Sequence, residues 1–182
     1  MRKPVKYVIF PTKWGYFGFS GSEKGLLRTC LPAQEYEEIE ARLLQSSPLA
    51  QFNRPFFQQA QDRIAAYFHG DEADLGLEIP IDLTGLTPFQ REVLTACRRV
   101  APGTTTTYGR LAEKIGKPKA ARAVGNALAK NPLPLIIPCH RILPANNSLG
   151  GFSSPGGLML KEKLLMHEER QIGKIEHLFS LT

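Results

Sequence analysis

The sequence contains few cysteines, and their number and spacing indicate neither a disulfide-stabilised protein nor a metal site built on cysteine pairs. Three cysteines occur among the 182 residues, far apart at Cys30, Cys97 and Cys139. An odd number of scattered cysteines does not make a disulfide framework. No C-x-x-C pair is present, and the four histidines do not have the spacing of metal ligands. Nothing in the sequence therefore calls for a metal, although a structural zinc stays open, and no organic cofactor is implied for the chemistry.

Long apolar runs are absent as well. No stretch approaches the roughly 18 apolar residues that indicate a membrane-spanning helix. The first residues, Met1 to Lys6, are basic, but no apolar stretch follows them as it does in a signal peptide. The sequence therefore predicts no membrane partner and a cytoplasmic location.

The charge is distributed unevenly along the chain, which carries a net charge of +6. Residues 1–82 hold 9 Lys or Arg and 11 Asp or Glu, whereas residues 83–182 hold 14 and 6. The first part is thus weakly acidic, at −2, and the second is strongly basic, at +8. A basic half indicates either a surface for a polyanion such as nucleic acid or an ordinary solvated face.

The first third has the pattern of a small α/β domain. Pro32 is expected to open a helix that buries Ile39 and Leu43, and a second helix is expected between Pro55 and Gly70. Three short stretches rich in aromatic and β-branched residues precede these helices and are separated by tight turns. They predict an antiparallel sheet: residues 5–10, 14–19 and 26–30.

An acidic, turn-rich stretch from Glu72 to Leu86 follows these helices. It includes a possible extended piece at Ile79–Ile81. We expect it to link two domains, an α/β domain over residues 1–84 and a mainly helical domain over residues 85–182.

The second domain opens with a strong signal for a helix. Thr87, Pro88 and Gln90 supply an N-cap, a proline for the first helical position and a capping-box partner. Further helices are expected from about Tyr108 and from about Pro118 to Lys130. Helix, turn, helix in a basic domain fits a winged-helix-like DNA-binding unit, and it fits an ordinary helical hairpin equally well.

The last of these three helices is rich in alanine and glycine, which makes it thin. Val124 and Leu128 can face the core together with Ala121, which leaves Arg122 and Asn126 on another face. A thin helix can pack closely on a neighbouring helix, or it can enter a narrow groove of DNA. In the second case Arg122 is placed to fill the gap that an extruded base leaves.

Cys139 differs from the other two cysteines in its surroundings. Cys30 ends a predicted strand and Cys97 lies on an apolar helix face, so both fit small buried side chains. Cys139 stands in a Pro-Cys-His-Arg motif, among residues that do not build cores. A nucleophilic cysteine reacts as its thiolate, and His and Arg are groups that lower a thiol pKa or take its proton. Adjacent side chains rarely face each other, so His140 is expected to act through a bridging water.

A glycine-rich loop, residues 146–157, follows this motif and either folds over a ligand or simply connects two elements. The final helix is expected from Leu158 to about Arg170, with Leu158, Leu164 and Leu165 used for packing. Its Glu168 is a candidate to orient His140 as the third member of a Cys-His-acid relay.

Taken in order, these motifs resemble the O6-alkylguanine-DNA alkyltransferases, also called methylated-DNA–protein-cysteine methyltransferases. The segment Asn131–Ile142 is similar to the active-site motif of that family. Residues 103–109 resemble the turn into its helix-turn-helix, residues 120–125 its recognition helix, and residues 157–168 its closing helix. The resemblance covers about residues 84–170.

The resemblance implies a role for each matching residue. Cys139 would accept the alkyl group, His140 would take its proton through a water, and Glu168 would support His140. Tyr108 would rotate the nucleotide and place its hydroxyl near the guanine O6, and Asn131 would tie the recognition helix to the active-site turn. The residues expected at the DNA are Tyr108, Ala121, Arg122, Asn126 and Lys130. The residues expected at the flipped base are Arg141, Ile142, Phe152 and Ser153.

The loop departs from the family in two places. Phe152 stands where many relatives have tyrosine, so a hydroxyl is lost there and a ring wall remains. Ser154-Pro155 looks inserted relative to some relatives, which bears on the contacts expected of Ser153.

The implied activity is single-turnover transfer of an alkyl group from O6-alkylguanine in double-stranded DNA to Cys139, by a monomer. The thioether product would persist, because no group that activates water for its cleavage is evident. Three alternatives stay open: a sensor that binds alkylated DNA without transfer, a thiol hydrolase of the Cys-His-acid type, and a helix-turn-helix transcription regulator. The branch of the family that binds without transfer has tryptophan at the cysteine position, so Cys139 favours transfer.

Overall fold

The computed structural model describes residues 4–71, 75, 77–146 and 148–180, with side chains described as far as Gly173. Residues 72–74 and 76 of the expected linker, and Asn147 of the glycine-rich loop, lie outside the described residues. The chain divides into two compact units. One holds Met1–Thr84 with Pro132–Ile136, and the other holds Gly85–Asn131 with Ile137–Thr182.

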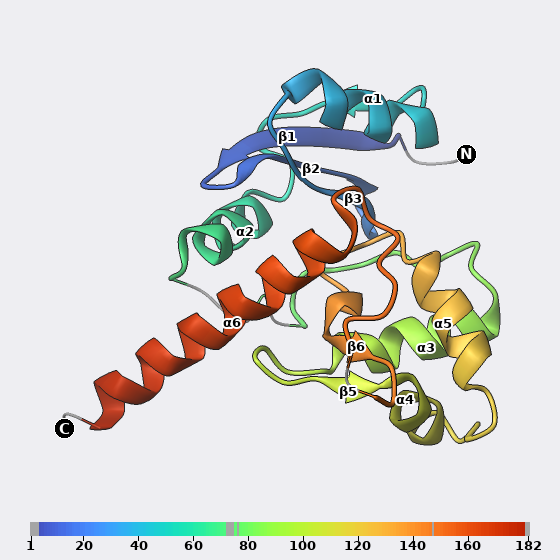
Figure 1. Cartoon of the computed structure of the whole chain (residues 1–182). Coiled ribbons are helices and arrows are strands. Elements are labelled where there is room, and N and C mark those ends of the chain that lie inside the picture. The colour runs from blue at the N-terminus through green and yellow to red at the C-terminus, as the bar shows by residue number, and fades with distance from the viewer. Residues whose placement is uncertain (1–3, 72–74, 76, 147, 181–182) are drawn as a thin grey trace. The chain divides into compact units, whose positions relative to one another are not determined.

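The first unit is built on a four-stranded sheet in the order β3-β2-β1-β4 (Figure 1). Its strands are β1 (Lys6–Thr12), β2 (Gly15–Ser22), β3 (Gly25–Ala33) and β4 (Gln51–Phe52). The first three pair antiparallel, as the sequence predicts, and the short β4 pairs parallel to β1. The extended piece near Ile81 is also present, as a parallel bridge to Leu26.

Helices cover both faces of this sheet, and β2 explains how they approach it. Phe17 and Phe19 are fully buried on one face, where α2 (Gln58–His69) brings the ring of Phe68 to 5.8 Å from that of Phe17. Gly18 points to the opposite face, where a Cβ would lie 2.5 Å from Ile39 Cγ2. The absence of a side chain at Gly18 therefore lets α1 (Tyr36–Ser46) pack directly on the strand.

The expectation that Pro32 opens a helix is wrong. Strand β3 continues through Pro32 to Ala33, and α1 begins at Tyr36. The pairing of β3 with β2 is irregular between Cys30 and Ala33, so the proline falls in a bulge. Proline is tolerated there because a bulge leaves a residue outside the hydrogen-bonded ladder.

The second unit is mainly helical, as predicted. It holds α3 (Pro88–Arg98), α4 (Tyr108–Lys114), α5 (Ala121–Ala129) and α6 (Gly157–Ser180), with the short parallel strands β5 (Thr106–Thr107) and β6 (Ile142–Leu143). The predicted capping box is confirmed at α3. The Gln90 N–H donates to Thr87 Oγ1 at 3.2 Å, and the Thr87 N–H donates to Gln90 Oε1 at 3.0 Å.

Helix α5 starts three residues later than expected and buries a slightly different face. Val124 and Leu128 are buried, as predicted, but Ala127 is the alanine buried with them and Ala121 is half-buried. Arg122 is exposed. The helix therefore keeps a solvent-facing side on which small residues surround an arginine.

Helix α6 is longer than predicted, and fewer of its leucines are buried than the sequence predicts. Leu164 is fully buried, whereas Leu158 is 46% exposed, so the expectation that Leu158 packs in the core is wrong. Leu158 is the second residue of the helix, before the face that carries Leu164 and Glu168 becomes buried. Among the described helices none is both long enough and apolar enough to cross a membrane.

Candidate functional site

Cys139 lies at the start of a single 3₁₀ turn, η1 (Cys139–Arg141), directly before strand β6. The backbone of the turn is held closely: the Cys139 N–H donates to Ile137 O at 2.8 Å, and the Arg141 N–H donates to Pro138 O at 2.9 Å. Cys139 is partly exposed, whereas Cys30 and Cys97 are buried. Cys139 is thus the least buried of the three cysteines.

The segment before this turn is fixed within the first unit. Thr29 of β3 donates its N–H to Pro132 O at 3.0 Å and its hydroxyl to Pro134 O at 2.7 Å. Leu135 then adopts a positive φ of 78°, which is unusual for a leucine and is maintained only where surrounding contacts enforce it. A strained, anchored segment therefore leads into the cysteine turn.

Asn131 connects the end of α5 to the cysteine. Its side-chain amide donates to Ile137 O at 2.8 Å and to Cys139 Sγ at 3.2 Å. Burial raises the pKa of the Cys139 thiol, and the hydrogen bond from Asn131 opposes that effect. Asn131 thus contacts the sulfur directly, which gives it a favourable interaction with a thiolate.

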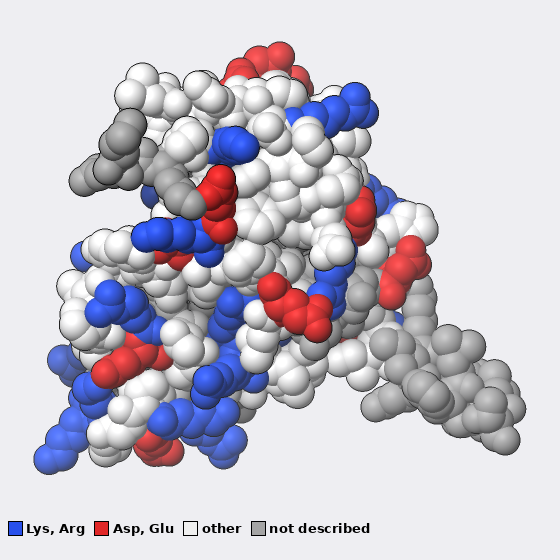
Figure 2. Space-filling view, turned by 180° about the vertical axis from the view of Figure 1, so that it is seen from behind, with Lys and Arg blue, Asp and Glu red and all other residues white. Residues whose placement is uncertain are grey.

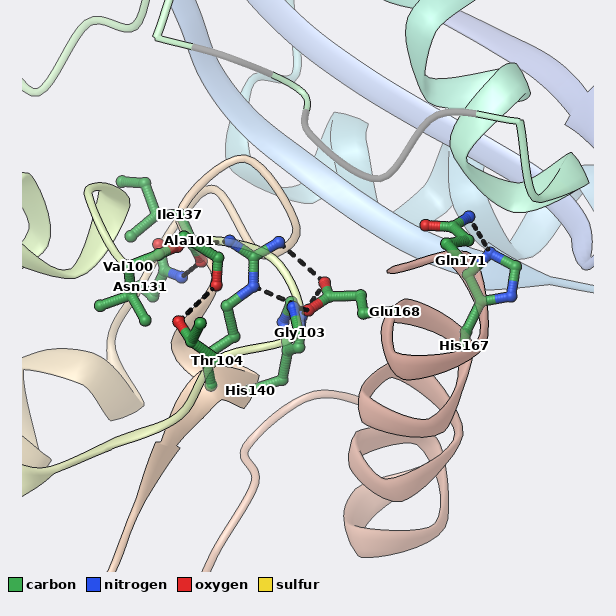
Figure 3. Close-up of polar contacts among 11 residues, drawn as sticks. Val100, Ala101, Gly103, Thr104, Asn131, Ile137, His140, His167, Glu168 and Gln171 are labelled. Atoms are coloured by element: carbon green, nitrogen blue, oxygen red, sulfur yellow. Dashed lines mark hydrogen bonds and ion pairs between the residues drawn. The ribbon is translucent and has the colours of Figure 1, made fainter. Parts of the chain in front are cut away.

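A buried polar network joins two residues of the turn, His140 and Arg141, to Glu168 (Figure 3). His140 Nε2 lies 2.8 Å from Glu168 Oε1, and the two side chains are 1% and 0% exposed. Arg141 donates to both carboxylate oxygens of Glu168, at 2.9 and 2.8 Å, and also to Val100 O. The Gly103 N–H donates to Glu168 Oε2 at 3.2 Å. These hydrogen bonds bring groups from the active-site turn and from the segment after α3 to a single carboxylate.

The charges of this network follow from those contacts. Burial alone would raise the pKa of Glu168, but its contacts with His140 and Arg141 outweigh burial and hold the pKa at about 2. Burial lowers the pKa of His140, and Glu168 offsets this only in part. Glu168 is therefore ionised and His140 is neutral at pH 7. A carboxylate only accepts hydrogen bonds, so Nε2 carries the histidine proton and Nδ1 is left as an acceptor.

Arg141 lies elsewhere than the resemblance implies. It was expected at the flipped base, but it is only 6% exposed and its guanidinium is directed at Glu168 and Val100. A planar guanidinium forms bidentate pairs with carboxylates, and Glu168 supplies the matching partner inside the protein. The contacts of Arg141 thus support the network and not a substrate.

Lys161 was not singled out by the sequence. It is fully buried, and its Nζ lies 2.8 Å from the backbone oxygen of Ile142, one of the residues expected at the flipped base. A signal was present, because Lys161, Leu164 and Glu168 are spaced by three and four residues and so share one helix face. A lysine on the buried face of α6 could have been noticed from that pattern.

Tyr108 is the first residue of α4 and is half-buried. Burial raises the pKa of its hydroxyl, and the proximity of Cys139 raises it further, so the hydroxyl is protonated at neutral pH. Helix α5 passes close to this ring, since a Cβ on Gly125 would lie 3.8 Å from it. The structure therefore places Tyr108 near both the cysteine and α5.

The other residues expected to bind lie on the surface or in the loop. On α5, Arg122 and Asn126 are exposed, and Lys130 follows the helix, also exposed. In the loop, Phe152 is half-buried, and Ser153 is exposed without a hydrogen bond to any described residue. No set of three or more His, Cys, Asp or Glu in the described part of the chain is arranged to hold a metal ion.

Comparisons with known proteins identify the family to which the chain belongs. Residues 88–170 match the family model of the 6-O-methylguanine DNA methyltransferase, DNA binding domain. The chain is 35% identical over 163 residues to a methylated-DNA–protein-cysteine methyltransferase of Methanosarcina acetivorans, covering 89% of this chain and 97% of that relative.

Solved structures extend the similarity to the fold of both units. The crystal structure of the Mycobacterium tuberculosis O6-methylguanine methyltransferase matches with a TM-score of 0.74 and 32% identity, covering 92% of this chain and 94% of that chain. The crystal structure of Mycobacterium tuberculosis OGT in complex with DNA matches with a TM-score of 0.76 and 31% identity, covering 91% and 94%. The chain therefore belongs to the 6-O-methylguanine DNA methyltransferase family.

Proposed function

We propose that this protein repairs alkylated DNA by moving an alkyl group once, and irreversibly, from O6 of a guanine in double-stranded DNA to Cys139. The observation that carries the proposal is the thiol of Cys139, a partly exposed residue, hydrogen-bonded by Asn131 and adjoining the buried His140–Glu168–Arg141 network. Membership of the family, and the names of relatives aligned over nearly the whole chain, support the same activity. We propose that it acts as a cytoplasmic monomer, without a metal or cofactor.

The network serves to remove the thiol proton. Cys139 begins as a thiol because burial raises its pKa. Neutral His140 has Nδ1 available as an acceptor, and a water between imidazole and sulfur carries the proton to it. The imidazolium that forms is stabilised by ionised Glu168, and Arg141 keeps that carboxylate ionised in its buried position.

The transfer itself is a displacement at the alkyl carbon. The Cys139 thiolate forms a sulfur–carbon bond while the bond from carbon to O6 breaks, and the electron pair of that bond goes to the guanine. A donor at O6 lowers the cost of the developing charge, and the protonated hydroxyl of Tyr108 suits that role. The departing guanine takes up one proton, which balances the one that His140 received from the thiol, so His140 returns to its neutral form. The protein keeps a thioether, and the acceptor is used up.

The base must leave the duplex to reach Cys139. Figure 2, viewed from behind, shows lysine and arginine side chains gathered over the surface of the second unit, as a DNA-binding face requires. We propose that α4, the turn after it and α5 act as the helix-turn-helix, and that exposed Arg122 enters the stack when the base is extruded. Ala121, Asn126 and Lys130 would contact the strand around it, and Phe152 and Ser153 would border the base.

The stoichiometry of transfer tests this proposal. The protein is incubated with an excess of duplex containing O6-methylguanine, and the peptide that carries Cys139 is examined by mass spectrometry. We expect a gain of one methylene per protein molecule and then no further reaction, and we expect Cys139→Ser to bind the duplex without any gain. Binding by the wild type without a mass gain would identify a sensor. Repeated turnover on an ester or peptide without DNA would identify a hydrolase.

A further inference from the structure

Lys161 is a buried cation that the proposed transfer step does not use. It is fully buried on α6, where an isolated ammonium is costly unless it is hydrogen-bonded. Its described partners are two backbone carbonyls, Ile142 O at 2.8 Å and Gly151 O at 3.5 Å. Within the described residues no carboxylate forms an ion pair with it. A lysine kept in such a position needs an explanation other than ordinary charge pairing.

The two carbonyls belong to the two segments that border the cysteine. Ile142 begins β6, immediately after the turn that carries Cys139, and Gly151 lies in the glycine-rich loop, next to Phe152. An ammonium has three N–H donors and no acceptor, so one lysine can hold two carbonyls at once. Lys161 thus ties the loop to β6 through a single group.

The same ammonium acts on the sulfur. Lys161 lowers the pKa of the Cys139 thiol, and Cys139 in turn raises the pKa of Lys161, which burial otherwise lowers. The other side chains that interact with this thiol are Asn131, Tyr108 and Cys97, and none of them carries a positive charge. Lys161 is therefore the cationic side chain, among those described, that favours the thiolate.

We propose that Lys161 is a positioning residue for alkyl transfer, whose ammonium holds the Gly151 loop against β6 and stabilises the Cys139 thiolate. This inference rests on the proposed function, because it assigns the loop and the thiolate to that reaction. It makes the geometry of the base-binding loop and the reactivity of the sulfur depend on one buried charge.

The proposed effect of the Lys161 charge on Cys139 can be tested by the reactivity of the Cys139 thiol in the absence of DNA. The rate at which iodoacetamide modifies Cys139 is measured against pH, with the modified peptide resolved from those of Cys30 and Cys97. Lys161→Met keeps a side chain of similar length without charge, so its profile should move to higher pH, with a rate about tenfold lower at neutral pH. Lys161→Arg should stay near wild type, and Lys163→Met, exposed on the same helix, is the matched control. A Lys161→Met profile that coincides with wild type would overturn the proposal.

A measurement on the wild-type protein guards against a variant that does not fold. By thermodynamic linkage, the Cys139 thiolate raises the pKa of Lys161 by as much as the Lys161 charge lowers the pKa of Cys139. Alkylating Cys139 with iodoacetamide removes the thiolate, so the pKa of Lys161, followed by NMR of its side chain, should fall. An unchanged value would also reject the proposed interaction.

The proposed link from the Gly151 loop to β6 through Lys161 is tested by a separate measurement. Amide hydrogen exchange at Gly151 to Ser153 should be faster in Lys161→Met than in Lys163→Met, and Lys161→Arg should restore protection. Equal exchange in all of these proteins would show that the loop does not depend on Lys161. Because these experiments use no DNA, their failure stays distinct from failure of the proposed function, which the methyl stoichiometry of the wild type decides.

Discussion

His140 Nε2 lies 2.8 Å from Glu168 Oε1, and both side chains are inaccessible to solvent. The contact joins residues 28 positions apart and fixes the tautomer of a histidine adjacent in sequence to the reactive cysteine. Glu168 at the same time receives two hydrogen bonds from Arg141. One buried carboxylate therefore both orients the proposed base and balances a buried guanidinium.

Replacing that carboxylate should cost both stability and activity. Glu168→Gln leaves the guanidinium of Arg141 buried without its counter-charge, which typically destabilises a protein by roughly 3–5 kcal/mol. It also removes the charge that stabilises the imidazolium of His140, so methyl transfer should slow by at least about tenfold. Urea unfolding and single-turnover transfer to Cys139 measure the two effects. Glu169→Gln, exposed at the next position, is the control, and equal behaviour of the two variants would contradict this account.

The stability of the protein should decline in acid because of the same residue. The pKa of Glu168 is about 2 in the folded protein and 4.5 for an ordinary glutamate. A lowered folded-state pKa stabilises the fold above the ordinary value, and this contribution is lost as pH falls from about 4.5 towards about 2. For this fully buried group the loss is about 3 kcal/mol. The free energy of unfolding in urea, measured across this pH range, should have a smaller slope for Glu168→Gln than for wild type. An equal slope would assign the acid sensitivity to other groups.

Local signals in the sequence were sufficient for several elements. The capping box at Thr87 and the start of α4 at Tyr108 depend on a few neighbouring residues, and both were predicted. The placement of Pro32 was not predicted correctly. A proline before an apolar helical pattern usually marks a helix start, but here the pairing of β3 with β2 extends the strand through it. That pairing is a long-range interaction that no local pattern contains.

The candidate site was predictable as a motif but not as a geometry. Cys139 and Glu168 could be chosen from their sequence contexts, whereas the direction of the Arg141 side chain could not. Arg141 points into the protein because Glu168 and Val100 O, 27 and 41 positions away, supply its acceptors. The spacing of Lys161 with Leu164 and Glu168 indicates the buried face of α6, but the acceptors of Lys161 are backbone carbonyls, which leave no mark in the sequence.

Asn131 should control how reactive Cys139 is. Its amide donates to Cys139 Sγ and also to Ile137 O, so Asn131→Ala removes a hydrogen bond to the sulfur and one that holds the turn. The thiol pKa should rise, and modification of Cys139 by iodoacetamide should slow by about tenfold at neutral pH. Asn131→Asp should slow it further, because it places a negative charge beside the thiolate. The matched control is Asn126→Ala on the exposed side of α5, which should react as wild type does. A fast reaction in Asn131→Ala would mean that the hydrogen bond does not affect the thiolate.

Arg122 should separate the handling of DNA from the chemistry at Cys139. It is exposed on α5, so Arg122→Ala removes the side chain proposed to fill the emptied stack without touching the buried network. Transfer from O6-methylguanine in duplex DNA should fall by at least about tenfold, because extruding a base costs a few kcal/mol that the arginine would no longer offset. Transfer from the free base O6-benzylguanine needs no extrusion and should stay at the wild-type rate.

Arg28→Ala, an exposed arginine of the first unit, controls for the loss of one positive charge. If Arg122→Ala slowed the duplex and free-base reactions equally, Arg122 would be acting on the chemical step, and the assignment of α5 to base extrusion would be wrong.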